Sequence, residues 1–138
     1  MMASILIMLK ILFAGIGVLT GWFLGGLDAV VYALIALIIV DYIADIMRGV
    51  VTKELSSSAG IRKIFQKVLI ILLVGVANII DIYLIRSNNA PLRTAVTFFY
   101  MVNQAISLLE NAAIIGIPIP AVLKDTLIKL QNDEDTKD

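Results

Sequence analysis

The chain has 138 residues, 60% of them hydrophobic, and a mean hydropathy of +0.99, whereas soluble domains are about 45–50% apolar. This composition is typical of an integral membrane protein. Eleven basic and eleven acidic residues cancel, and no basic face interleaved with aromatic residues indicates nucleic-acid binding. The chain has neither Cys nor His, and this excludes disulfides, catalysis by a thiol or an imidazole, and Cys/His metal sites. We therefore expect no catalytic residue, metal site or cofactor.

The first apolar run covers residues 5–27 and is interrupted only by Lys10. A basic residue inside the run, rather than before it, argues against a cleaved signal peptide. We expect Lys10 to snorkel to the near membrane interface, or the span to begin near Ile11. Gly17, Gly21 and Gly25 follow at intervals of four and form one smooth strip on a helix. Such strips let two helix backbones approach closely in lipid, so we predict a packing face, against another helix of the chain or another subunit.

Gly25-Gly26 ends this helix, and Asp28 is placed to cap the next one. The short connection predicts an antiparallel hairpin with the second run, residues 29–47. Asp41, Asp45 and Arg48 follow at i, i+4 and i+7 and share one helix face. One interpretation is an interfacial ladder in which Arg48 neutralises Asp45. The other is a carboxylate stripe that faces water in a pore or a neighbouring subunit, and Asp41, the deeper residue, fits either.

A basic loop, residues 48–63, separates this run from the third, residues 64–85. Five basic residues lie in or just after the loop: Arg48, Lys53, Arg62, Lys63 and Lys67. Their number predicts that this loop is cytoplasmic. Asn78 and Asp81 stand in the last third of the third run. Asp81 is either an interfacial partner of Arg86 or a buried polar contact.

The fourth run, residues 94–117, is less apolar and carries a polar stripe opposite Phe98, Met101, Ala105 and Leu108. The stripe consists of Asn103, Ser107, Glu110 and Asn111. The run either spans the membrane, with the stripe facing helices or water, or lies along the interface as an amphipathic helix.

The expected fold is an all-α integral membrane protein with a transmembrane helical domain at residues 1–117. It has four membrane spans, or three if the fourth run does not cross. Residues 118–138 form a short amphipathic helix, about residues 121–130, and an acidic disordered tail from Gln131. With four spans, the basic loop and both termini are cytoplasmic.

The order of motifs along residues 28–131 resembles the phage holins of the toxin-secretion/phage-lysis type, the clostridial-type holins. The resemblance begins with Asp41-Tyr42, then Leu55-Ser56-Ser57, then Gly60 with Lys63 and Lys67, and the apolar run that closes on Asp81. Further on, the resemblance is carried by six residues: Ser107, Glu110, Asn111, Gly116, Pro118 and Pro120. At Gln104 the chain departs from the family pattern, where an acidic residue is common.

The resemblance implies a holin, which homo-oligomerises in the bacterial cytoplasmic membrane and forms large lesions that release a cytoplasmic endolysin, or a toxin. Its expected partners are other copies of the chain and the lipid bilayer, with functional coupling to an endolysin. Eight residues are candidates for polar stripes, pore lining or subunit contacts: Asp41, Asp45, Asn78, Asp81, Asn103, Ser107, Glu110 and Asn111. The alternative is a small oligomeric transporter or ion channel. A membrane enzyme with Asp41 and Asp45 as metal ligands is a weaker third hypothesis, because no further carboxylate completes the site.

Overall fold

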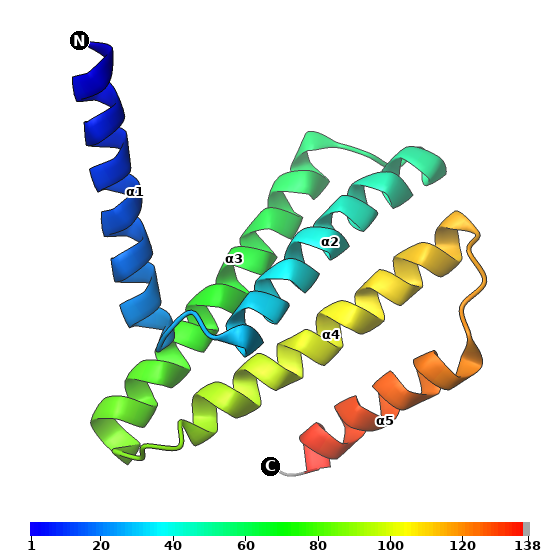
Figure 1. Cartoon of the computed structure of the whole chain (residues 1–138). Coiled ribbons are helices and arrows are strands. Elements are labelled where there is room, and N and C mark those ends of the chain that lie inside the picture. The colour runs from blue at the N-terminus through cyan, green and yellow to red at the C-terminus, as the bar shows by residue number, and fades with distance from the viewer. Residues whose placement is uncertain (137–138) are drawn as a thin grey trace.

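The computed structural model describes the backbone of residues 1–136 and the side chains of residues 1–133, and in this part the fold is entirely helical (Figure 1). The helices are α1 (Met2–Leu24), α2 (Ala29–Thr52), α3 (Ser57–Ile80), the π-helical segment η1 (Asp81–Ile85), α4 (Pro91–Ile115) and α5 (Ala121–Thr136). Four segments are long and apolar enough to cross a membrane: Met2–Leu24, Ala29–Thr52, Ser57–Ile85 and Pro91–Ile115. The predicted all-α fold with four candidate spans and a short C-terminal helix is confirmed.

The second and third candidate spans are longer than predicted, because the basic stretch is mostly helical. α2 continues to Thr52 and α3 begins at Ser57, where the Ser56 hydroxyl accepts a hydrogen bond from the Ala59 amide and caps the helix. The turn is therefore only four residues long. Of the five basic residues assigned to this stretch, Lys53 alone lies in the turn, as the C-cap of α2. Arg48 belongs to α2, and the other three belong to α3.

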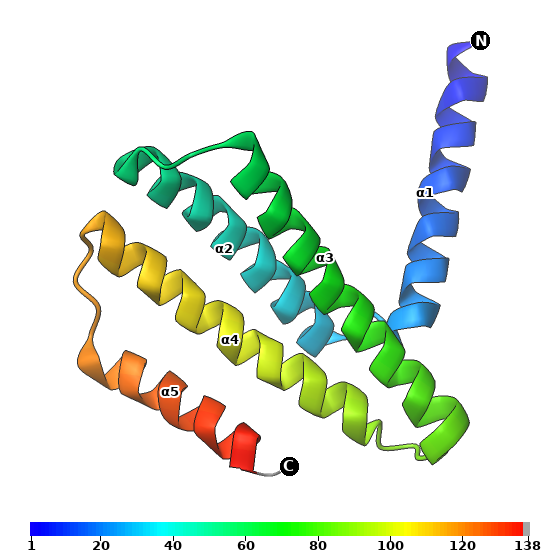
Figure 2. The same ribbon diagram turned by 180° about the vertical axis from the view of Figure 1, so that it is seen from behind.

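Helices α2, α3 and α4 lie side by side as a three-helix bundle, with α3 antiparallel to the other two (Figures 1 and 2). α2 packs more extensively against α4 than against α3, its neighbour in sequence. The apolar core lies toward the end of the bundle where α2 begins. It consists of Leu24, Val31, Leu34, Ile38, Ile70 and Val74, with Phe23, Tyr100 and Met101 among the side chains packed on it.

Helix α1 extends away from this bundle as an arm, so the antiparallel hairpin predicted for the first two helices does not form (Figures 1 and 2). Among the described residues, only the last turns of α1 contact the rest of the chain, mainly α3. There the Phe23 ring packs directly on Gly75, where a Cβ atom would overlap the ring. Gly25 caps α1 with a φ of 82° and lies against Asn78 and Arg93. Any side chain at Gly25 would be strained and would collide with both residues.

Asp81 anchors the start of α4. The N-cap position of α4, Ala90, provides no side-chain cap. Instead, the two carboxylate oxygens of Asp81 accept hydrogen bonds from the amides of Leu92 at 3.0 Å and Arg93 at 2.7 Å. A carboxylate at a helix N-terminus satisfies free N–H groups and faces the positive end of the helix dipole. Asp81 is fully buried in this role, which fits the buried-contact interpretation, and it forms no ion pair with Arg86 among the described side chains.

Helix α5 folds back beside α4 and continues to Thr136, beyond Leu130, where the sequence predicted it to end (Figure 1). The predicted disorder from Gln131 is therefore wrong as far as Thr136. The last part of the predicted tail, residues 137 and 138, lies outside the described residues.

Candidate functional site: a buried ionic network in the helix bundle

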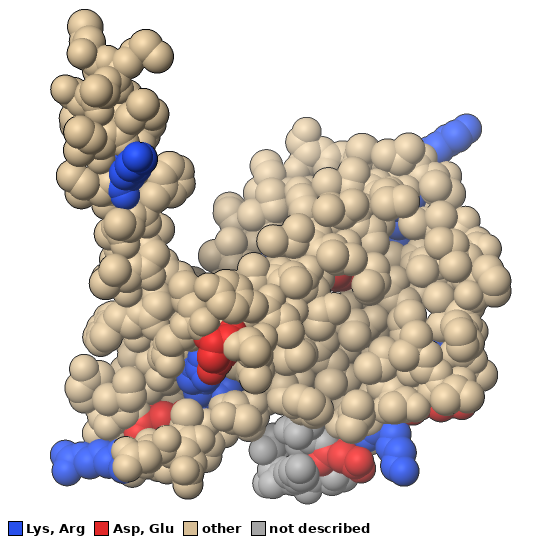
Figure 3. All heavy atoms as spheres, in the orientation of Figure 1, with Lys and Arg blue, Asp and Glu red and all other residues tan. Residues whose placement is uncertain are grey.

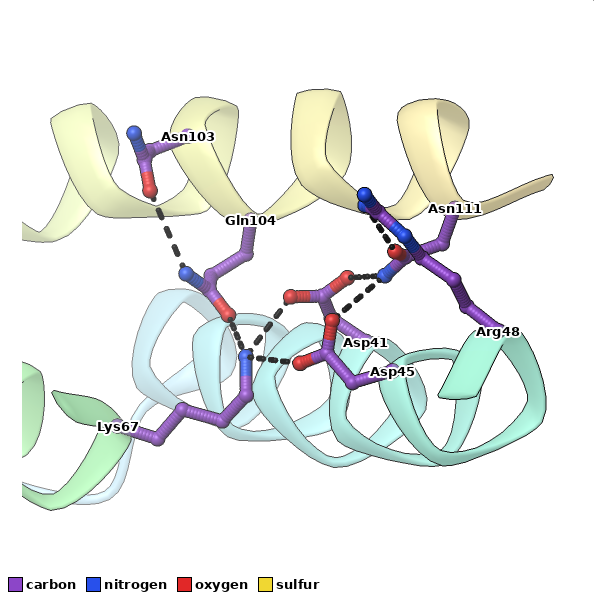
Figure 4. A network of polar contacts seen from close by, with 7 residues as sticks. All are labelled: Asp41, Asp45, Arg48, Lys67, Asn103, Gln104 and Asn111. Carbon is purple, nitrogen blue, oxygen red and sulfur yellow. Dashed lines mark hydrogen bonds and ion pairs between the residues drawn. The ribbon is translucent and has the colours of Figure 1, made fainter. Parts of the chain in front are cut away.

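The ammonium group of Lys67, on α3, lies inside the bundle and binds groups from both neighbouring helices (Figure 4). It donates to the Asp41 carboxylate of α2 at 2.7 Å and to the Gln104 side-chain oxygen of α4 at 2.7 Å. The Asp45 carboxylate lies 3.8 Å away. Lys67, Asp41 and Gln104 are all buried. One cation therefore joins all three helices of the bundle.

Asn111, on α4, completes the network on the side away from Lys67 (Figure 4). Its amide nitrogen donates to Asp41 at 3.0 Å and to Asp45 at 2.8 Å. Its amide oxygen accepts a hydrogen bond from Arg48 at 3.2 Å. Because Asn has both donors and an acceptor, Asn111 bridges two carboxylates to a guanidinium. Arg48 therefore reaches the carboxylates through Asn111, and the predicted direct neutralisation of Asp45 by Arg48 does not occur.

The network lies near the middle of a candidate span. At 1.5 Å per residue, Asp41 is about 18 Å from the start of α2 and about 17 Å from its end. The sequence had placed Asp41 closer to the membrane surface because the second span was expected to end at residue 47. Ionisable groups at such depth are costly in lipid unless they are paired. Here two carboxylates face two cations, so the network is neutral overall.

Because its charges balance only when the groups are together, the network favours one alignment of α2, α3 and α4. An ion pair in a low-dielectric interior gains little over an apolar pair, because desolvation of both charges offsets their attraction. Loss of one partner, by contrast, leaves a buried charge without compensation. The network therefore penalises any displacement of α2, α3 or α4 that separates these groups. One Asp45 oxygen has no hydrogen-bond donor, and Thr97 likewise has an unpaired buried hydroxyl.

A polar groove connects the network to the surface between α3 and α4. It encloses about 310 Å³. Its polar lining consists of Asp41, Lys63, Gln66, Lys67, Tyr100, Asn103, Gln104 and Ser107. Asn103 and Ser107 are half-buried on its α4 side, and Gln66 is exposed on its α3 side. A single chain thus presents a polar surface between two of its candidate membrane spans.

The predicted polar residues fall into separate places. Asp41, Asp45 and Asn111 meet in the network, and Asn103 borders it through a 3.4 Å contact with Gln104. Ser107 lies in the groove, and Glu110 is exposed. Asn78 and Asp81 lie far from the network, at the end of the bundle that holds the turn between α1 and α2. The four-residue stripe of α4 is therefore divided, and only Asn111 faces the bundle interior.

The opposite end of the bundle holds a second polar cluster that fixes the α1–α2 turn. Arg93 donates to the Leu24 carbonyl, to the Gly26 carbonyl at 3.0 Å and to the Asp28 carboxylate at 3.1 Å. Asn78 donates to the carbonyls of Trp22 and Phe23. As predicted, Asp28 also caps α2, accepting a hydrogen bond from the Val31 amide at 3.0 Å. The Arg93 hydrogen bond holds the pKa of Asp28 below its ordinary value, against an opposing effect of burial.

Two of these roles were absent from the sequence reasoning. Lys67 was assigned to the basic loop, and no role was predicted for Arg93. For Lys67 a signal existed. Counted outward from the turn between α2 and α3, Asp41 and Lys67 lie at nearly equal distances, so antiparallel helices bring them to the same level. Arg93 offered no such pattern, because two of the three partners of its side chain are backbone carbonyls.

The glycine strip of α1 does not pack within the chain. No atom outside the helix lies within 4 Å of a Cβ built at Gly17, and Gly21 meets only the Leu27 side chain. Gly25 serves the turn instead. The glycine that packs closely against another helix is Gly75 on α3, which lies outside the predicted strip and contacts the Phe23 ring of α1. No group of three or more acidic residues is placed to hold a metal ion among the described residues.

Comparisons with known proteins identify the family. A model of the bacteriophage holin family matches residues 18–132. A probable holin of Bacillus phage phi105 is 38% identical over 104 residues, covering 75% of this chain and 76% of that protein. An uncharacterised Clostridium perfringens protein is 35% identical over 136 residues, covering 99% of this chain and 100% of its own length. An uncharacterised Listeria innocua protein is 38% identical over 122 residues, covering 88% of this chain and 86% of its own length.

No solved structure matches the chain. The family match covers the network, the groove and most of α5, and it agrees with the resemblance found from the motifs. The chain belongs to the bacteriophage holin family of non-enzymatic, multi-pass membrane proteins.

Proposed function

We propose that this chain homo-oligomerises in the bacterial cytoplasmic membrane and forms lesions large enough to release an endolysin, or a toxin. Membership of the holin family supports the general role. The observation that carries the oligomeric lesion is the polar groove between α3 and α4, which opens at the side of a membrane-embedded bundle. Lipid cannot satisfy polar groups such as Asn103 and Ser107, so another subunit or water must cover them.

The proposed orientation places the turn between α2 and α3, both termini and α5 in the cytoplasm. The turn and its flanking helix ends carry Arg48, Lys53, Arg62 and Lys63, and basic residues next to spans are retained on the cytoplasmic side. The connections at the other ends of the spans hold fewer basic residues, Arg86 and Arg93. A cytoplasmic C-terminus also leaves the charged helix α5 in water or at the interface.

A small oligomeric transporter or ion channel is the second candidate. The observation in its favour is the Lys67–Asp41 pair, an ionisable site near the middle of a span that a groove connects to the surface. The two functions differ in what crosses the membrane. A transporter or channel passes small solutes and ions, whereas a holin lesion passes a folded protein.

Induced expression in bacteria separates the two candidates. We expect the membrane potential to collapse and a cytoplasmic reporter enzyme to appear outside spheroplasts, whose cell wall has been removed. A matched culture that expresses the chain with a stop codon in α2 controls for the effects of induction. Loss of potential without enzyme release favours the channel, and an intact potential with full membrane insertion contradicts both functions.

A further inference from the structure

Helix α1 carries one charged residue, Lys10, on a surface that its own chain leaves uncovered. An 18-residue stretch of α1 has a mean hydropathy of 2.3, and none of this stretch is buried. Figure 3 shows one basic patch on the arm, and Lys10 is the only Lys or Arg that the sequence places there. Lys10 forms no ion pair with any described side chain. An unpaired ammonium at this depth is costly in lipid, so a partner would stabilise it.

The face of α1 that carries Lys10 is otherwise smooth. Ala14, Gly17 and Gly21 follow Lys10 at i+4, i+7 and i+11, so all four residues lie along one side of the helix. No atom of the described residues fills the space next to Gly17. A helix that presents small residues lets the backbone of a second helix approach closely, and this brings a polar side chain on the same face within reach of its partner.

The complementary charge is Glu110 on α4. It is exposed, and it is the only acidic residue of α4. Asn103, Ser107 and Glu110 follow at i, i+4 and i+7 and form one polar stripe on this helix. Arg48 and Lys124 border the same cavity as Glu110, but neither lies within 4.0 Å of its carboxylate. Glu110 thus forms no ion pair among the described side chains.

The distances of these groups along their own helices agree. Arg93 binds the Leu24 carbonyl, which sets the last residue of α1 level with the start of α4. At 1.5 Å per residue, Lys10 lies about 21 Å from Leu24, and Ser107 lies about 21 Å from Arg93. Glu110 is one turn further, about 26 Å from Arg93, on the side toward which a lysine snorkels. When α1 of one copy lies along α4 of another, with Leu24 level with Arg93, Lys10 of the first therefore reaches the polar stripe of the second.

We infer that α1 of one chain docks on the α4 stripe of a second copy, with Lys10 paired to Glu110 and the small residues of α1 against α4. The second copy is the occupant because the two charges are opposite, lie at similar distances along their helices and have no ion-pair partner among the described side chains. Lys63, on the α3 side of the groove, repels Lys10 and restricts docking to the α4 side. The contact joins two different surfaces, so it repeats from copy to copy and generates rings or chains rather than closed pairs. The inference rests on the oligomer proposed above.

Disulfide crosslinking tests this contact without interference, because the natural chain has no Cys. The pair Lys10→Cys and Ser107→Cys places two thiols at the same level on the facing helices. Oxidised membranes should give a ladder of covalent multimers from the doubly substituted chain. Two co-expressed single variants should give only dimers. The control pair Leu12→Cys and Ser107→Cys, with the thiol on the opposite face of α1, should crosslink at least several-fold less.

Charge reversal provides the second test. Lys10→Glu and Glu110→Lys should each lower the multimer fraction several-fold, and the double variant should restore it. Equal crosslinking from Leu12→Cys, or single and double reversals with equal effects, would overturn the contact. If these results occur while the chain still releases a reporter enzyme, only the interface is wrong. If no release occurs in any variant or in the natural chain, the proposed lesion itself fails.

Discussion

The Lys67 ammonium and the Asp41 carboxylate form a 2.7 Å ion pair inside the bundle, near the middle of the second candidate span. Only 1% of the Asp41 side chain is exposed. The pair joins α3 to α2, and Gln104 and Asn111 join both to α4. The alignment of three helices thus depends on a small set of polar contacts that lipid cannot replace.

Lys67→Met should destabilise the bundle by about 3–5 kcal/mol, because it leaves the buried Asp41 and the half-buried Asp45 carboxylates without their cation. Reversible unfolding in detergent would measure the loss. Lys63→Met is the matched control, since Lys63 lies one turn earlier on the same helix and is exposed. It should change stability by no more than about 0.5 kcal/mol. Equal effects of the two substitutions would show that the network contributes nothing specific.

Asn111→Ala should cost about 2–3 kcal/mol, because the buried Asp41 and the half-buried Asp45 and Arg48 all lose a hydrogen-bond partner. Asn103→Ala, on the same helix but half-buried at the edge of the network, should cost less than about 1 kcal/mol. The same unfolding measurement compares the two. A larger loss for Asn103→Ala than for Asn111→Ala would contradict the proposed role of Asn111 in the network.

Asp81→Ala should release the first turn of α4, since both carboxylate oxygens hold backbone amides there. The expected loss is about 1–2 kcal/mol, as for other N-terminal caps. Hydrogen exchange at Leu92 and Arg93 should accelerate at least tenfold, while exchange at the core residue Val74 changes less. Asp81→Asn keeps one acceptor oxygen and should give an intermediate rate. Unchanged exchange at both amides would exclude the capping role.

Asp28 should contribute to stability in a pH-dependent way. Its pKa is lowered below the ordinary 3.8, chiefly by the Arg93 hydrogen bond. A carboxylate with a lowered folded pKa adds stability above the unfolded pKa, and this contribution is lost as pH falls through the folded pKa. Carboxyl NMR of Asp28 should therefore give a midpoint below 3.8, and Arg93→Gln should raise it. A midpoint at or above 3.8 in the natural chain would contradict the Arg93 contact.

Much of the architecture follows from local sequence. Runs of apolar residues predicted the four candidate spans, and Asp28 and Ser56 were predictable caps because their positions precede helical segments. Span ends were misjudged where charged residues continue a helix, as at Arg48 and Lys63, because charge alone does not end a helix. The sequence predicted disorder after Leu130, but α5 continues to Thr136, again because charged residues do not end a helix on their own.

Contacts between distant segments were harder to predict. The burial of Lys67 depends on α4 supplying Gln104 at the level where α2 supplies Asp41, and a single helix pattern does not contain that information. The Phe23–Gly75 contact and the Arg93 cluster depend on how α1 leaves the bundle. The glycine spacing of α1 predicted a packing face, but no described helix of the same chain covers it at Gly17, so packing against another subunit stays a prediction.

The central claim is that copies of this chain together open a path for a folded protein. The most direct measurement reconstitutes the purified chain in vesicles that contain both a small dye and a fluorescent protein of enzyme size. We predict that both escape together once the chain exceeds a threshold density, and that Lys10→Glu raises this threshold while Lys10→Glu with Glu110→Lys restores it. Escape of the dye with full retention of the protein, at every density, would contradict the claim.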